Sequence, residues 1–339
     1  MPSGRPKLAQ TLYQGTTANS LVLIMPATKF ERRFHPSRLV RLLVSVAAIA
    51  ILLAIAGSSS LHRLVYSVQL LPVVLALVLH FLVYLIAAWR WWLLIRATGS
   101  TLPFRKLLPS YFLGLFLNNF FPSSLGGDVA RVIHLRRQRL PTNLLIASSA
   151  IDRLVGLLTA TAIASVFLVL PVDIGTSGLE RYVMLSISAA ALGLVILLLL
   201  PNTHAALQRL ANNHRLHRFI RTVAEVALNT EAYSRNRLAI PLSIILSVLS
   251  QLVMVAAYWA LGLAVGLRVT AMAYFVVVPF AFLAGSAPVS IGGLGVREAA
   301  IMLLLTTLQI SRPSAVTFAL LSLVVTVIST LPGALVLVL

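Results

Sequence analysis

Long uninterrupted hydrophobic stretches dominate this sequence, and their lengths predict helices that cross a membrane. A spanning helix needs about 20 apolar residues, and six stretches meet that requirement. None shows the alternation of apolar and polar residues that marks the strands of a membrane β-barrel. The six predicted spans are Leu39–Gly57, Val65–Trp89, Thr142–Leu170, Tyr182–Leu200, Leu238–Val265 and Pro313–Leu339.

Two further apolar segments are interrupted by proline and glycine, and the two interruptions resemble each other. Residues 122–131 and 288–297 both read Pro-x-Ser-aliphatic-Gly-Gly-x-x-x-Arg, with five of ten positions identical. An internal repeat of this kind indicates a chain built from two related halves. The shared residues are Pro122, Ser124, Gly126, Gly127 and Arg131 in the first half and Pro288, Ser290, Gly292, Gly293 and Arg297 in the second.

The first interrupted segment is too short to cross the membrane. Leu107–Phe121 would form a helix of about 22 Å, against a hydrocarbon core of about 30 Å. If the chain turns back at Gly126-Gly127, the basic residues of 128–139 and 201–237 lie on the same side of the membrane. We therefore predict a re-entrant hairpin here and a second one around Gly292-Gly293.

The distribution of basic residues predicts the topology. On this arrangement 21 of the 27 Lys and Arg residues are cytoplasmic, and cytoplasmic loops are rich in these residues. Both termini are then cytoplasmic, the protein lies in the plasma (inner) membrane, and the two halves have opposite orientations, as in many transporters.

The predicted fold class is thus an all-α polytopic membrane protein, an inverted repeat with about six spans and two hairpins. We expect residues 1–38 to be a disordered basic tail. Residues 39–339 form one membrane domain with halves 39–170 and 181–339 and a cytoplasmic basic loop, 201–237.

Composition narrows the possible functions. The formal net charge is +19, which by itself would suit nucleic-acid binding, but the basic residues lie in short loops beside spans, so we expect no nucleic-acid partner. The chain has no cysteine, which excludes disulfides and thiol chemistry. No metal-ligand spacing, phosphate-binding loop or nucleophile motif is present, and we expect no metal or cofactor.

Charged residues inside the predicted membrane segments are the best candidates for a site. A charge at membrane depth costs at least about 2.5–3.5 kcal/mol, so six of them need a reason. They either neutralise one another as structural pairs or line a wet cavity that receives a charged head group. These six residues are Asp128, Arg131, Asp152, Arg153, Arg297 and Glu298.

The predicted breaks suit an anionic ligand. A helix begins after each glycine pair, so free backbone N–H groups face the break, and an arginine follows whose planar guanidinium matches a phosphate. Asn118 and Asn119 precede the first break and are predicted to satisfy backbone groups there or to contact substrate. His80 and Gln251 are expected to hydrogen-bond between helices.

Three motifs resemble the flippase-like family, also called the lysylphosphatidylglycerol synthase transmembrane-region family. They are the sequences at 117–128, 152–158 and 288–298, and the resemblance covers about residues 38–339. It implies a domain that moves lipids, such as aminoacylated phosphatidylglycerol, between leaflets. Some members add a cytosolic aminoacyl-transferase domain, which we do not expect here because the sequence ends in its last span.

Three functions remain open at this stage. The first is translocation of a phospholipid, aminoacyl-lipid or polyprenyl-linked head group without covalent chemistry. The second is an integral-membrane transferase acting on a polyprenyl phosphate, with Asp128 or Glu298 as general base. The third is a non-transporting partner subunit of a lipid-modifying enzyme; a homo-oligomer is also open.

The predicted topology can be tested by cysteine labelling, because the natural chain has no cysteine. Cysteines introduced at Ser100 and Gln138 should both react with an impermeant reagent from the cytoplasmic side. Labelling of Gln138→Cys only from outside would make the first hairpin a full span and end the inverted-repeat prediction.

Overall fold

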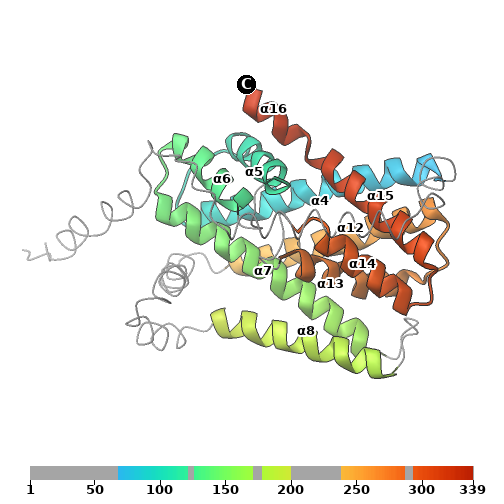
Figure 1. The fold of residues 1–339 in the computed structure, drawn as a ribbon. Helices are drawn as coiled ribbons and strands as arrows, with labels where there is room; N and C mark the ends of the chain where they lie inside the picture. Colours follow the sequence, from blue (N-terminus) through green and yellow to red (C-terminus); the bar gives the residue numbers. More distant parts are fainter. Residues whose placement is uncertain (1–67, 121–125, 171–177, 200–237, 287–292, 339) are drawn as a thin grey trace, which may run out of the picture. The chain divides into compact units, whose positions relative to one another are not determined.

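A computed structural model describes residues 68–120, 126–170, 178–199, 238–286 and 293–338 (Figure 1). Chain contacts group the protein into two units, Met1–Leu39 and Val40–Leu339, and all described residues belong to the second. The predicted tail 1–38, the span Leu39–Gly57 and the loop 201–237 lie outside the described residues.

Every regular element in the described ranges is helical, which confirms the all-α fold class. The helices are α4 (Leu70–Ala97), α5 (Phe104–Asn118), α6 (Gly126–Leu135), α7 (Thr142–Val169), α8 (Gly178–Leu199), α12 (Ala239–Val265), α13 (Tyr274–Ser286), α14 (Val296–Thr307), α15 (Arg312–Thr330) and α16 (Pro332–Val338), with 3₁₀ turns at Arg136–Gln138 and Ala271–Ala273.

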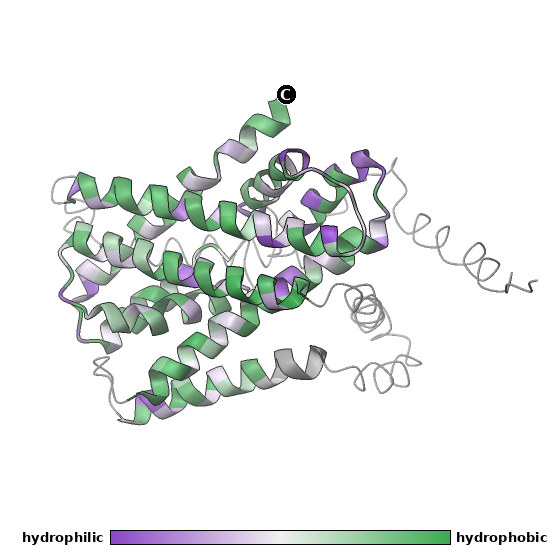
Figure 2. Ribbon diagram, turned by 180° about the vertical axis from the view of Figure 1, so that it is seen from behind, coloured by the Kyte–Doolittle hydropathy of each residue, from purple (hydrophilic) through white to green (hydrophobic). Residues whose placement is uncertain are grey.

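Four helical segments of the described chain are long and apolar enough to cross a membrane: α4, α7, α12 and the segment Arg312–Val338, which joins α15 and α16. Their outward faces are hydrophobic (Figure 2). On α4, for example, Leu71 is 81% exposed and Val78 is 60% exposed. Exposed apolar stripes of this extent are stable in lipid and not in water, so the helices face the hydrocarbon core.

The C-terminal end of the second predicted span, Val65–Trp89, is wrong, because α4 continues past Trp89 to Ala97. Trp91 is fully buried and Arg90 is buried as well. The helix continues because Arg90 finds an acidic partner inside the protein, so this charge does not need the interface.

Both interrupted segments form helical hairpins, α5 with α6 and α13 with α14, and the helices of each pair pack together. In each hairpin a glycine of the first helix allows close approach. A Cβ on Gly114 would lie 2.7 Å from the carbonyl oxygen of Gly127, and a Cβ on Gly293 would lie 2.6 Å from that of Gly285. The opposite orientation of the two halves stays a prediction.

The glycine pairs differ in conformation. Gly127 is the second residue of α6 and has a helical conformation, whereas Gly293 has φ +80°. Gly292 lies outside the described residues. Gly127 is therefore required for close packing, and Gly293 is required both for packing and for a backbone conformation that other residues rarely adopt.

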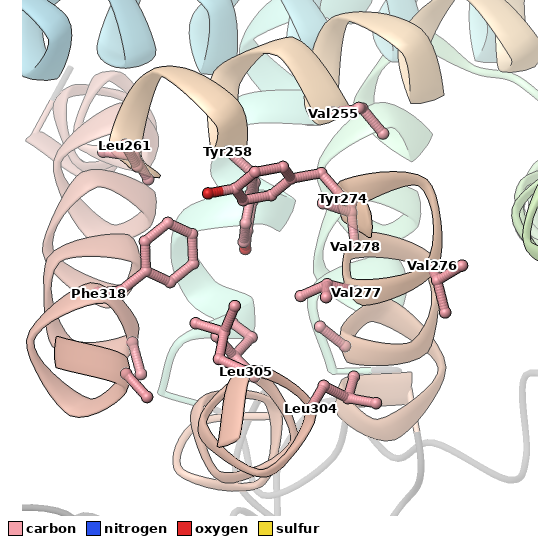
Figure 3. Packing of buried hydrophobic residues seen from close by; sticks show 14 of the residues in the cluster. Val255, Tyr258, Leu261, Tyr274, Val276, Val277, Val278, Leu304, Leu305 and Phe318 are labelled. Carbon is pink, nitrogen blue, oxygen red and sulfur yellow. The ribbon is translucent and has the colours of Figure 1, made fainter. Parts of the chain in front are cut away.

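The largest hydrophobic cluster joins α12, α13, α14 and α15 (Figure 3). Its aromatic centre consists of Tyr258, Tyr274 and Phe318, with ring centroids about 6 Å apart. α12 also packs along α4 over more of its length than any other pair of described helices. This framework places the second hairpin against the helices that carry the buried charges.

Gly127→Ala should lower the thermal stability of the purified protein. The added methyl group would lie 2.2 Å from the carbonyl oxygen of Gly114, so the hairpin must open, and overpacking typically costs about 1–3 kcal/mol. The matched control is Gly193→Ala in α8, where an added Cβ meets no atom within 4 Å. Equal melting temperatures for the two variants would contradict close packing at the first glycine pair.

Candidate functional site

A cavity of about 280 Å³ lies where the two hairpins meet the long helices. The first hairpin contributes Gly127 and Arg131, the second contributes Gly285 and Arg297, and α4, α7, α12 and α15 complete the wall. Both repeat arginines therefore face one cavity. The charged and histidine residues of its lining are His80, Arg90, Asp128, Arg131, Asp152, Arg153 and Arg297.

Five of these residues form a continuous chain of alternating charge. The Arg90 Nε donates to Asp152 Oδ1 at 2.7 Å, and Arg131 lies 3.4 Å from Asp152 Oδ2. Arg131 also contacts Asp128 at 2.9 Å, and Asp128 Oδ2 accepts from Arg153 at 2.8 Å. The chain connects α4, α6 and α7, and Arg90 extends it to α12 through Ser247, 2.7 Å away.

Arg131 is the centre of this chain and also contacts residues of α4, α5 and α7. It donates to Ser149 Oγ at 2.8 Å, and its guanidinium carbon lies 4.3 Å from the Trp91 ring centroid and 5.2 Å from that of Tyr111. Only 5% of the residue is exposed. Such a packed and paired arginine fixes the positions of its neighbours.

Arg153 and Asp128 form the more accessible end of the chain. Their side chains are 24% and 27% exposed, compared with 6% for Arg131. Asp128 lies in the first turn of α6, where the positive end of the helix dipole also stabilises a carboxylate. A ligand entering the cavity can reach this end of the chain more easily than Arg131.

The second hairpin carries a separate ion pair. The Arg297 Nε and Nη2 atoms lie 2.8 Å and 2.6 Å from Glu298 Oε1. Glu298 is fully buried, and its other oxygen accepts from the Gly295 N–H at 2.7 Å, which caps the start of α14. The Arg297 side chain keeps 19% exposure, so it presents charge to the cavity while Glu298 holds it from behind.

The described site carries one excess positive charge. Four arginines (Arg90, Arg131, Arg153 and Arg297) stand against three carboxylates (Asp128, Asp152 and Glu298). From sequence we counted three acids and three bases, which would neutralise one another. Arg90 changes that balance, and a site with charge +1 in a low-dielectric surrounding favours a single anionic group.

The remaining predicted site residues divide into three groups. Asn118 lines the cavity, whereas Asn119 donates to Thr330 Oγ1 at 2.9 Å and is not part of the lining. Glu298 is also outside the lining. Pro122, Ser124, Pro288, Ser290 and Gly292 lie outside the described residues.

The structure shows how the six charges predicted from sequence pair with one another. Asp128 pairs with Arg131 and Arg297 with Glu298, while Arg153 pairs with Asp128 and not with its neighbour Asp152. Adjacent residues of a helix point about 100° apart, so Asp152 and Arg153 face different partners.

Sequence reasoning missed Arg90 and misjudged His80. The signal for Arg90 was present, since an arginine inside a 28-residue apolar helix is itself a functional indicator. His80 was expected to bond between helices, but its Nδ1 lies 3.0 Å from the Ala76 carbonyl oxygen of the same helix. Gln251 lines the cavity.

The described residues around the cavity form no set of metal ligands. Across the described ranges, no group of three or more His, Asp or Glu side chains is placed to hold an ion. The arginines beside Asp128 and Asp152 occupy the carboxylate oxygens that a cation would need.

Two curated membrane proteins of archaea are similar to parts of this chain. A UPF0104 membrane protein of Methanocaldococcus jannaschii is 28% identical over 114 residues, which is 33% of this chain and 34% of that protein. A UPF0104 membrane protein of Pyrococcus horikoshii is 24% identical over 173 residues, 50% of each chain. The matches thus span at most about half the length of these relatives.

A much longer match defines the family. Residues 38–333 match the family described as the lysylphosphatidylglycerol synthase TM region. This range includes both hairpins and every residue of the described cavity. The chain is therefore an integral, multi-pass helical membrane protein that belongs to the lysylphosphatidylglycerol synthase TM region family.

Proposed function

We propose that this protein moves a lipid with an anionic head group between the two leaflets of a cell membrane, without covalent chemistry. The observation that carries the proposal is the cavity to which both hairpins contribute an arginine; with Glu298 behind Arg297 counted, four described arginines stand against three described carboxylates. A buried net charge is unfavourable unless a counter-charge enters. A phosphodiester, with its single negative charge, matches that requirement.

The size of the cavity supports a head group as the bound part. A volume of about 280 Å³ lies near the lower end of the range for small-molecule sites, about 300–1,000 Å³. A site of this size suits a small polar head group rather than a whole lipid. The acyl chains would stay in the lipid beside the exposed apolar helix faces while the head group passes through the protein.

The arginines take different roles in this proposal. Arg153 and Arg297 are partly exposed and would contact the phosphate in turn. Arg131 is buried and holds Asp128 and Asp152 in place. This assignment replaces the simpler expectation that Arg131 and Arg297 are equivalent contacts because they are equivalent in the repeat.

The proposed membrane arrangement follows the charge pattern of the sequence. We place both termini in the cytoplasm and the two halves in opposite orientations, so that one hairpin would open toward each side. A shared cavity between two broken-helix hairpins is the arrangement that alternating access requires.

A transferase acting on a polyprenyl phosphate is the second candidate. Asp128 is the acid that supports it, because it lines the cavity with a side chain that is 27% exposed. Glu298 does not, since it is fully buried and bonded on both oxygens. Turnover of a labelled lipid-linked sugar phosphate by purified protein would favour this candidate over translocation.

Arg153→Gln should slow the movement of an anionic lipid at least tenfold and leave folding intact. The substitution removes the excess charge of the site, while Asp128 keeps Arg131 at 2.9 Å as a partner. Movement is measured as exposure of a labelled phosphatidylglycerol in proteoliposomes, together with the melting temperature. The matched control is Arg96→Gln, an exposed arginine of α4 outside the cavity, and an equal loss in both variants would contradict a specific role for Arg153.

A double-variant cycle tests whether Arg297 contacts the lipid or only neutralises Glu298. Arg297→Gln alone should destabilise the protein by about 3–5 kcal/mol, since it leaves a fully buried carboxylate without its cation. Adding Glu298→Gln should restore the melting temperature but not lipid movement. Recovery of movement along with stability in the double variant would reduce Arg297 to a structural ion pair.

A further inference from the structure

His80 has one ring nitrogen whose hydrogen-bonding capacity the described protein leaves unused. Its Nδ1 lies 3.0 Å from the Ala76 carbonyl oxygen. Because a carbonyl oxygen only accepts, Nδ1 carries the proton, and Nε2 of the neutral ring is an acceptor. The residue is 1% exposed, and Nε2 has no partner in the described ranges.

The residues that carry the unpartnered atoms of the described chain all line one cavity. Three buried side-chain atoms lack a hydrogen-bond partner there: His80 Nε2, Asn118 Oδ1 and Arg131 Nε. All three residues line the cavity. Buried polar groups are almost always paired, so their coincidence at this place points to a ligand that supplies the missing partners. Two of the atoms accept hydrogen bonds and one donates.

The His80 ring is held firmly in the wall. It stacks on Tyr258 with ring centroids 5.7 Å apart, and Tyr84 meets it edge-on at 6.5 Å. Both tyrosines also line the cavity. A ring fixed by two aromatic neighbours and one backbone hydrogen bond presents its second nitrogen in a constant orientation, which is what selection between similar ligands requires.

We infer that His80 is a specificity-determining residue whose Nε2 accepts a hydrogen bond from an O–H or N–H group of the lipid head group. The inference rests on the proposed function, because it needs a head group in the cavity. It narrows the substrate class to lipids with a phosphodiester and a hydroxyl or ammonium donor. A methyl ester or a choline group has no such donor and would leave Nε2 unpaired, which a buried site penalises.

Four lipids separate charge from hydrogen bonding in the test. Phosphatidylglycerol and phosphatidylmethanol each carry one negative charge, but only the first has a hydroxyl donor. Phosphatidylethanolamine and phosphatidylcholine are both neutral overall, but only the first has an N–H donor. Equilibrium binding of each lipid to the purified full chain is measured in detergent, and movement of each is measured in proteoliposomes.

The wild-type protein should bind phosphatidylglycerol about tenfold more tightly than phosphatidylmethanol, the factor expected of one hydrogen bond. His80→Phe keeps a ring against Tyr258 and removes the acceptor, so the ratio should fall to about one. His80→Leu also removes the acceptor and should lower the ratio to about one; its smaller side chain covers the case that Phe does not fit. His80→Gln, which keeps an acceptor at a similar reach, should retain most of the preference.

The matched control is His134→Phe. His134 bonds Ser110 at 2.7 Å and does not line the cavity, so this change should leave the ratio between the two lipids at its wild-type value. Equal binding of the two anionic lipids to wild type would overturn the inference. An unchanged ratio in both His80→Phe and His80→Leu would overturn it equally.

The two proposals fail separately. A donor preference that depends on His80, without movement of any lipid across the bilayer, would uphold the His80 inference and overturn translocation. Movement of anionic lipids without a preference for a hydrogen-bond donor would uphold translocation and overturn the His80 inference. Binding of none of the four lipids would overturn both.

Discussion

The need to neutralise charge inside a membrane protein is the constraint on which this structure depends. The linked residues Arg90, Asp152, Arg131, Asp128 and Arg153 alternate in sign along the cavity wall. Each charge would be expensive at membrane depth by itself. Their partners come from three different helices, so the charges are tolerated only when α4, α6 and α7 are together. The ionic chain thereby specifies the mutual placement of these helices, which apolar contacts in lipid would specify poorly.

Close backbone approach is the second requirement, and it allows the first to be met. Gly114 against Gly127, and Gly285 against Gly293, let the two helices of each hairpin lie nearer than any side chain would permit. The arginine that follows each glycine pair consequently packs against the glycine of the partner helix. Backbone breaks of this type are stable at depth where they are buried in protein or line a cavity, and both hairpins border the same cavity.

The two halves share a sequence motif, but the arginines of that motif have different surroundings. Arg131 is enclosed by two aspartates, a serine and two aromatic rings, whereas Arg297 has one buried glutamate and remains partly exposed. The repeat thus gives the first half a buried, fully packed arginine and the second half an arginine that a ligand can reach. The proposed exchange of a head group between Arg153 and Arg297 uses this difference, and the single excess charge gives a reason for an anion to enter.

By itself, the sequence determined the membrane class, the all-helical fold and the existence of two interrupted segments. These features depend on the length of apolar runs and on proline and glycine, which act locally. It also identified Asp128, Arg131, Asp152, Arg153 and Arg297 as charges of interest, because charge inside an apolar segment is conspicuous wherever it occurs.

Only the tertiary structure decided which charges meet. Asp152 turns away from its neighbour Arg153 to Arg90, 62 residues earlier in the chain, and no pattern of spacing encodes a pairing between different helices. The same limit applies to Asn119, which bonds Thr330 rather than facing the cavity, and to His80, whose free nitrogen becomes meaningful only beside Tyr258 and the cavity. Arg90 likewise joins the described site from a different helix and gives it four arginines against three carboxylates. Helical periodicity places a side chain on a face, but the partner of that face is set by how the helices pack.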